Sequence, residues 1–129
     1  MKRIFTNGCF DILHRGHVEL LKYCKSMGYV IVGLNDDSSV KENKGLSRPF
    51  NNQYDRKFLL ESLECVDEVL FFSEKTPYNL IKSLKPDIIV KGGDYTADEV
   101  VGRDLAEVKI FKFIDEYSTT KTIKDLASR

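Results

Sequence analysis

The chain has 129 residues, of which 42% are hydrophobic and 31% charged, and its 20 basic residues balance 20 acidic ones. This length is typical of a single domain, which we expect across residues 1–129. A formal net charge of zero argues against a nucleic-acid-binding protein or a polybasic membrane surface. The apolar runs are too short to cross a bilayer, and three isolated cysteines indicate reduced thiols in the cytoplasm.

The first third of the chain alternates short apolar runs with amphipathic stretches, which predicts an α/β fold. Residues 3–6 predict a first buried strand, and a turn-rich connector follows at 8–16. From His17 onward apolar residues recur at helical spacing, and Gly28 supplies a stop signal. Residues 29–35 form an unbroken apolar run, which is typical of a parallel strand covered on both faces.

Residues 36–52 are polar and include a glycine and a proline, which predicts a long loop of the kind that is usually functional or disordered. Beyond it helices and strands alternate again, and Pro77 opens one helix where its missing N–H costs nothing. The expected helices are 54–63, 77–84 and 118–127, and the expected strands are 66–72, 87–91 and 107–113. We therefore expect a doubly wound, mostly parallel five-stranded sheet with helices on both faces, and ligands at the carboxyl ends of the strands.

The connector after the first strand carries the residues with the clearest chemistry. It reads Thr6-Asn7-Gly8-Cys9-Phe10-Asp11-Ile12-Leu13-His14-Arg15-Gly16-His17. A doubly wound fold binds anions here, and Gly8 and Gly16 let backbone N–H groups approach phosphate oxygens. His14 and His17, the only histidines, are three residues apart and can face one point. Two such donors suit a phosphate chain better than a metal, because no third ligand stands at metal-binding spacing. The alternative is that both histidines merely cap the helix.

The pattern Gly8-x-Phe10-Asp11-x-x-His14-x-Gly16-His17 resembles the signature of the cytidylyltransferase-like nucleotidyltransferases. The resemblance extends over essentially the whole chain, and Ser118-Thr119-Thr120 looks like the Ser-Thr-Thr with which that family binds nucleotide phosphates. It implies a Rossmann-like fold and an enzyme that joins a nucleoside triphosphate to a phosphorylated sugar or polyol and releases pyrophosphate. It also implies Mg²⁺ accompanying the triphosphate, and a homodimer.

Parts of the chain look most like one branch of this family, the heptose 1-phosphate adenylyltransferases, which make ADP-heptose precursors for bacterial lipopolysaccharide. The stretches that carry this likeness are 33–40, 44–49 and 90–95. Glycerol-3-phosphate cytidylyltransferases are the nearest alternative, but Phe113 replaces the phosphate-facing Arg of that branch. Segment 102–107 is shorter than usual in the heptose branch, and Glu116 stands where Gly is common there. The choice between ATP and CTP therefore stays open.

These observations give a set of candidate site residues. We expect His14 and His17 to stabilise charge developing on the α-phosphorus, and Lys44 to draw the phosphates together. Candidate nucleotide-binding residues are Gly8, Cys9, Phe10, Gly16, Lys91, Gly92, Asp94, Ser118, Thr119 and Thr120. Candidate substrate-binding residues are Asp11, Arg48 and Arg56, with a solvated surface role as the alternative for both arginines.

Two other functional classes compete with this interpretation. A non-catalytic nucleotide sensor on the same fold would be favoured if the histidines were replaced, and both are present. A redox or thiol protein is disfavoured because the cysteines are solitary.

Overall fold

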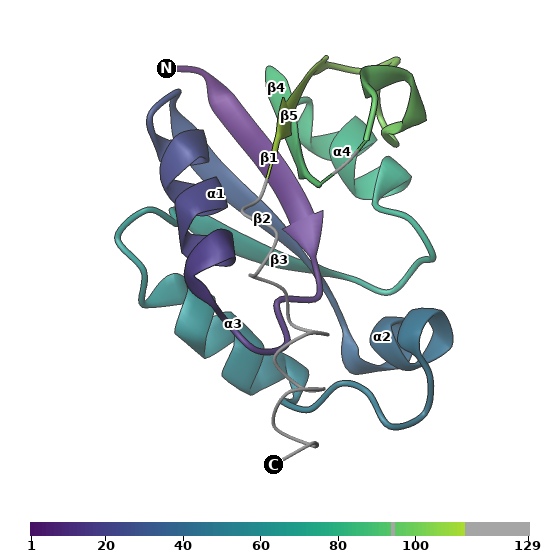
Figure 1. Cartoon of the computed structure of the whole chain (residues 1–129). Helices are drawn as coiled ribbons and strands as arrows, with labels where there is room; N and C mark the ends of the chain where they lie inside the picture. The colour runs from purple at the N-terminus through teal and green to yellow at the C-terminus, as the bar shows by residue number, and fades with distance from the viewer. Residues whose placement is uncertain (94, 113–129) are drawn as a thin grey trace.

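The computed structural model describes residues 1–93 and 95–112. Within them one five-stranded sheet has the order β3-β2-β1-β4-β5, and all of its pairings are parallel (Figure 1). The strands are β1 (Arg3–Gly8), β2 (Tyr29–Asn35), β3 (Glu68–Phe72), β4 (Ile88–Gly92) and β5 (Glu107–Phe111). The expected α/β, doubly wound fold is confirmed.

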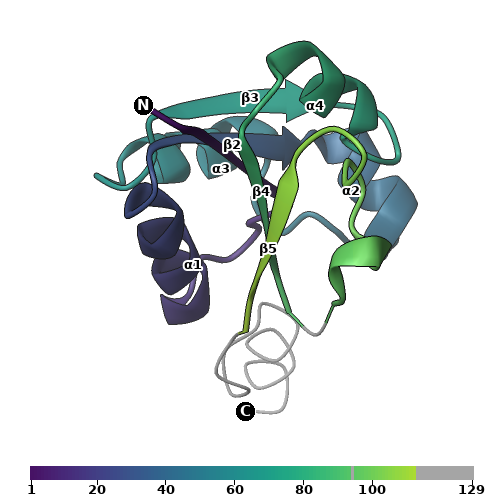
Figure 2. The same cartoon turned by 90° about the horizontal axis from the view of Figure 1, so that it is seen from above.

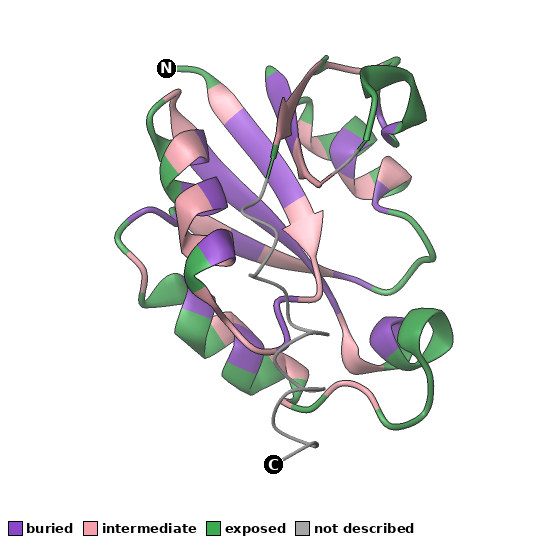
Figure 3. Cartoon of the chain, viewed as in Figure 1, coloured by how far each residue is buried: buried purple, intermediate pink, exposed green. Residues whose placement is uncertain are grey.

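Helices cover both faces of this sheet, as Figure 2 shows from above. They are α1 (Arg15–Lys25), α2 (Asp37–Lys44), α3 (Gln53–Glu61) and α4 (Tyr78–Leu84), with a short 3₁₀ turn η1 (Ala97–Glu99) after β4. Side chains of α1 and α3 pack on one face, and Ile81 of α4 packs on the other. Strand β2 alternates between the two, since Val30 and Val32 join the first core and Ile31 the second. Nearly all of β2 is buried (Figure 3). Burial on both faces explains why the strand is apolar without interruption.

The prediction of one long loop over 36–52 is wrong, because its first half is the helix α2. The Asp36 side chain caps this helix by accepting from the Ser39 N–H, and Gly45 ends it with φ 104°. Only Ser39 and Val40 are buried along α2, so the sequence shows no apolar period. The connector after it is short and spans 45–52.

Other element boundaries differ by a few residues from those expected. Helix α1 begins at Arg15 rather than His17, because His14 occupies the capping position. Strand β1 continues through Gly8, which carries the backbone two residues further toward the connector. The expected helix 118–127 lies outside the described residues.

The chain reverses direction across the sheet at β1. From β1 it passes through α1 to β2 on one side, whereas α4 on the opposite face leads into β4, which pairs with the other edge of β1. The carboxyl ends of β1 and β4 therefore splay apart around a crevice. In open α/β sheets this is the position where ligands bind.

Candidate active site

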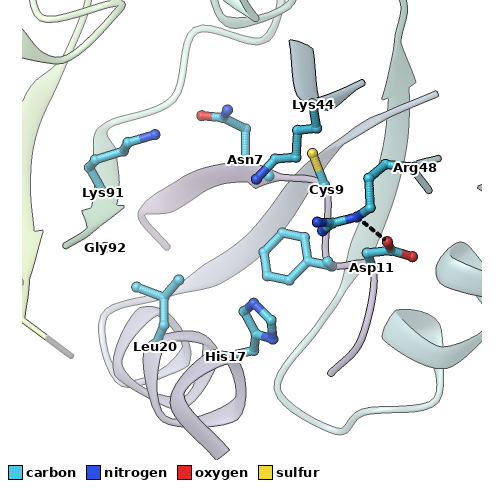
Figure 4. A pocket seen from close by; sticks show the side chains of 11 residues that line it. Asn7, Cys9, Asp11, His17, Leu20, Lys44, Arg48, Lys91 and Gly92 are labelled. Carbon is cyan, nitrogen blue, oxygen red and sulfur yellow. Dashed lines mark hydrogen bonds and ion pairs between the residues drawn. The ribbon is translucent and has the colours of Figure 1, made fainter. Parts of the chain in front are cut away.

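A pocket of about 160 Å³ lies in this crevice, between the ends of β1 and β4 and the first turn of α1 (Figure 4). It brings together most of the predicted site residues, and it adds Asn7 and Leu20. Its lining residues are Asn7, Gly8, Cys9, Phe10, Asp11, His17, Leu20, Lys44, Arg48, Lys91 and Gly92. The neighbouring strand and helix ends thus converge on one small volume.

The two histidines cap α1 and stack on each other. His14 Nδ1 accepts from the Gly16 N–H at 3.0 Å, and His17 Nδ1 accepts from the His14 N–H at 3.2 Å. Their ring centroids are 3.8 Å apart, with planes 22° from parallel. Because each Nδ1 is an acceptor, the hydrogen bonding assigns the ring proton to Nε2. Capping and chemistry are therefore not alternatives, since the cap fixes which nitrogen can donate to a ligand.

Both imidazoles are neutral at physiological pH. Burial is the main cause that lowers the pKa of His17 to about 3, and the nearby His14 and Lys44 act in the same direction. Burial also lowers the pKa of His14. The rings can still donate Nε2–H to a phosphate oxygen, but the positive charge of the pocket must come from other residues.

That charge comes from two lysines. Lys44 at the end of α2 and Lys91 near the end of β4 extend into the pocket from opposite sides, with Asn7 between them (Figure 4). Burial lowers the pKa of Lys91, and the charge of Lys44 lowers it further. Within residues 1–93 and 95–112, no ion pair joins either lysine to a carboxylate. Two like charges facing one volume favour an anionic ligand there.

Asp11 lies at the edge of the pocket but is bonded to the protein. Its buried carboxylate accepts from the Phe50 N–H at 2.7 Å, the Asn51 N–H at 2.8 Å and Arg48 Nε at 3.0 Å. Burial alone would raise the pKa of Asp11, but these donors outweigh it and hold the pKa below its usual range. The expected contact with a substrate hydroxyl is thus replaced by a positioning role for the segment around Phe50.

The prediction that Arg56 binds substrate is wrong, because its side chain is fully buried. It donates to the carbonyl oxygens of Asn51, Cys9 and Asn35 at 3.0, 2.9 and 2.7 Å, and to Asp37 Oδ1 at 2.8 Å. Arg56 therefore ties the signature connector to the end of β2, the start of α2 and the connector before α3. Its position four residues before the buried Leu60, on one face of α3, is the only sequence signal for this burial.

The remaining candidates are divided between the pocket and other places. Cys9 lines the pocket, but burial raises the pKa of its thiol, which disfavours a nucleophilic thiolate. Gly16 is buried in the first turn of α1 and gives its N–H to His14 instead of to a ligand. The candidates Asp94, Ser118, Thr119 and Thr120 lie outside the described residues.

The comparison with known proteins decides the family. The cytidylyltransferase-like family model matches residues 5–125. The chain belongs to this family. The family membership predicted from the connector motif is therefore confirmed. Residues of that motif line the pocket described above.

Two bacterial relatives of this chain are named bifunctional protein HldE. The chain is 60% identical over 125 residues to that of Aliarcobacter butzleri, and 57% identical over 127 residues to that of a Nitratiruptor species. The matches cover 95% and 97% of this chain but 26% and 28% of the relatives, so the chain spans about a quarter of their length. A crystal structure of a lipopolysaccharide core biosynthesis protein from Thermoplasma volcanium shares 29% identity and a TM-score of 0.73, covering 88% of this chain and 97% of that one.

Two features are absent from residues 1–93 and 95–112. No group of three or more His, Cys, Asp or Glu converges there in a way that would hold a metal ion. No helix in the same part of the chain is both long and apolar enough to cross a membrane.

Proposed function

We propose that this chain is a nucleotidyltransferase that transfers AMP from ATP to a heptose 1-phosphate and releases pyrophosphate. The observation that carries the proposal is the pocket between β1 and β4. There the neutral imidazole of His17, on which the His14 ring stacks, converges with two lysines that have no ion-pair partners among the described residues, and this combination suits phosphates.

The reaction needs charge stabilisation more than proton transfer. An oxygen of the acceptor phosphate attacks the α-phosphorus of ATP, and the bond from that phosphorus to the bridging oxygen breaks, so that the electron pair leaves with pyrophosphate. The attacking oxygen is already anionic, and no strong general base is required. Lys44 and Lys91 offset the charge of the two phosphates, while Nε2–H of His14 and His17 donates to oxygens that gain charge in the transition state.

Mg²⁺ completes this proposal as a companion of the triphosphate. The Asp11 carboxylate, the one acidic side chain that lines the pocket within the described residues, already accepts three hydrogen bonds from the protein. An ion would therefore be held mainly by phosphate oxygens, as is common for Mg²⁺ in nucleotide sites. It would neutralise part of the charge that leaves with pyrophosphate.

The proposals that ATP is the donor and that a heptose 1-phosphate is the acceptor rest on similarity to other proteins. The stretches 33–40 and 90–95 look like the heptose 1-phosphate adenylyltransferase branch, and the HldE relatives match nearly the whole chain at 57–60% identity. The name of the Thermoplasma protein, which concerns lipopolysaccharide core biosynthesis, agrees with an acceptor of that kind. We further propose a homodimer, on the family resemblance alone, and a cytoplasmic location, because the three isolated cysteines suit reduced thiols.

One assay tests the proposal. Pyrophosphate release is measured for ATP, CTP, GTP and UTP against D-glycero-D-manno-heptose 1-phosphate, glycerol 3-phosphate and other phosphorylated polyols. ATP with the heptose should exceed CTP with glycerol 3-phosphate by orders of magnitude, because a site that bonds several hydroxyls rejects acceptors that lack them. If CTP is the better donor by about tenfold at a matched acceptor, cytidylyl transfer replaces adenylyl transfer. Nucleotide binding with no release from any pair would indicate a sensor.

A further inference from the structure

A second chamber of about 240 Å³ adjoins the pocket and shares Asn7 and Lys91 with it. We call the pocket of Figure 4 the first chamber. The second chamber lies beyond Lys91, between the start of α4 and the segment around η1. It is lined by Asn7, Lys75, Thr76, Pro77, Lys91, Tyr95, Glu99, Val100 and Val101. Lys91 therefore stands at the boundary of two adjoining spaces.

The ring of Tyr95 holds Lys91 at this boundary. Lys91 Nζ lies 4.9 Å from the centre of the ring, a distance at which an ammonium group is attracted to the face of an aromatic system. The chain reaches this arrangement because Gly93 has φ 119°, and a Cβ at Gly93 would lie 3.2 Å from the Tyr95 ring. The positive φ of Gly93 thus accompanies an arrangement in which the Tyr95 ring covers the Lys91 ammonium group.

The contact with the Tyr95 ring helps Lys91 to stay charged. Lys91 is partly buried and lies near the like charge of Lys44, and both effects lower its pKa. An aromatic face offsets part of that cost without placing a carboxylate beside the ammonium group. Lys91 therefore keeps its charge available for an anion that enters from either chamber.

The walls of the second chamber suit a molecule rich in hydroxyl groups. Glu99 Oε1 accepts from the Thr96 N–H at 3.0 Å and from Thr96 Oγ1 at 2.8 Å, so the carboxylate is held in place at the wall. Lys75 and Asn7 add further donors to the lining. A small chamber lined by several polar groups, of which Glu99 is fixed by hydrogen bonds, discriminates among ligands by their hydroxyls more strongly than by their apolar parts.

We propose that the second chamber binds the hydroxyl-bearing body of the phosphorylated acceptor, with the acceptor phosphate at Lys91, and that Tyr95 is the positioning residue that keeps Lys91 between the chambers. The inference rests on the proposed function, because it assigns the attacking phosphate to that boundary. Phosphates of the nucleotide then occupy the first chamber, and the acceptor approaches the α-phosphorus from the side of Lys91. Glu99 becomes a determinant of acceptor specificity.

Steady-state kinetics of four variants test these roles with heptose 1-phosphate and ATP. Tyr95→Leu should raise the KM for the acceptor about tenfold and leave the KM for ATP within about twofold, because only the cation–π contact is lost. Tyr95→Phe keeps the aromatic face and should match the wild type. Glu99→Gln preserves an acceptor for Thr96 but loses the charge, and should raise the KM for the acceptor several-fold. Tyr54→Leu is the matched control, since Tyr54 is exposed on α3 and lines neither chamber.

The inference is overturned if Tyr95→Leu changes the KM for ATP instead of that for the acceptor, or if Tyr95→Phe behaves like Tyr95→Leu. Calorimetric titration with mannose 1-phosphate, without nucleotide, separates it from the proposed function. The wild type should bind this hexose phosphate, and Tyr95→Leu should bind it about tenfold more weakly. Equal affinity, or no binding by the wild type, contradicts the second chamber even if transfer occurs. Absence of transfer to every acceptor, with binding intact, contradicts the proposed function alone.

Discussion

Two groups of basic side chains lie around the same crevice, and they differ in what they are bonded to. The guanidinium groups of Arg56 and Arg48 are paired with carboxylates of the protein, and Arg56 also donates to three backbone carbonyls. The ammonium groups of Lys44 and Lys91 extend into the pocket without such partners among the described residues. The contrast teaches that a basic residue beside this pocket stabilises the protein when its donors bond protein groups, and is available to a ligand when they do not.

Replacement of Arg56 should give the largest effect on stability. Arg56→Met leaves Asp37 and three carbonyl oxygens without their buried donor, which should lower the free energy of unfolding by about 3–5 kcal/mol. Urea denaturation measures this loss. Arg15→Met is the control, because the Arg15–Glu19 pair is largely exposed and should contribute less than about 1 kcal/mol. Similar small losses in both variants would contradict the structural role of Arg56.

Asparagine at either histidine should give the largest effect on turnover. Its side-chain oxygen can replace Nδ1 as the capping acceptor, but its amide NH2 group is too short to donate from the position of Nε2–H. His14→Asn and His17→Asn should therefore fold normally and lose about 10²–10³ in turnover, or roughly 3–4 kcal/mol of transition-state stabilisation. Circular dichroism and single-turnover rates report the two properties. A folded variant with near-normal turnover would remove that histidine from the chemistry.

Local patterns were enough to predict the sheet and the connector that lines its crevice. The apolar run at 29–35 and the connector motif each depend on neighbouring residues, and both interpretations agree with the structure. The role of Arg56 could not be predicted in this way. Its partners Cys9 and Asn35 lie 47 and 21 residues away, and only the folded chain brings their carbonyl groups to one point. Helix α2 was missed for a related reason, since its single buried apolar side chain, Val40, sets no period.

Replacement of Lys44 should have the opposite effect to replacement of Arg56. Lys44→Met removes a charged donor to phosphate and should reduce kcat/KM for ATP by about 10–100-fold, in line with about 1.5–3 kcal/mol for a charged hydrogen bond. Its stability should stay equal or rise slightly, because the repulsion of Lys91 is relieved. Pyrophosphate release and urea denaturation on the same preparation test both parts. A clear loss of stability would mean that Lys44, like the two arginines, stabilises the protein.

The depressed pKa of His17 predicts a pH-dependent stability with a defined sign. The unfolded chain takes up the His17 proton near pH 6.5, whereas the folded chain does so only near pH 3, so acid favours unfolding between these values. The wild type should lose about 1–2 kcal/mol more than His17→Asn between pH 6.5 and 5, a range above the titration of the carboxylates. Urea denaturation across this range measures the difference. If the free energies of unfolding of the wild type and His17→Asn fall equally with pH, His17 is not buried as a neutral ring.

Arg48 combines features of both groups, and its replacement should change stability and substrate binding the least. It is paired with Asp11, with 15% of its side chain exposed, yet it also lines the pocket. Arg48→Met leaves Asp11 with the N–H groups of Phe50 and Asn51, so the stability loss should be only about 1 kcal/mol.

The Arg48→Lys variant separates its two roles, because lysine keeps the charge but does not reproduce the planar donor geometry toward Asp11. If Arg48 serves the protein, both variants should speed hydrogen exchange at the amides of Phe50 and Asn51 by severalfold and leave the KM for ATP unchanged. If it also serves the ligand, Arg48→Met should raise that KM about two- to threefold and Arg48→Lys should restore it. Exchange unaltered in both variants would show that the two backbone donors alone hold the Asp11 carboxylate, and the comparison would then separate Arg56 from every other basic residue of the crevice.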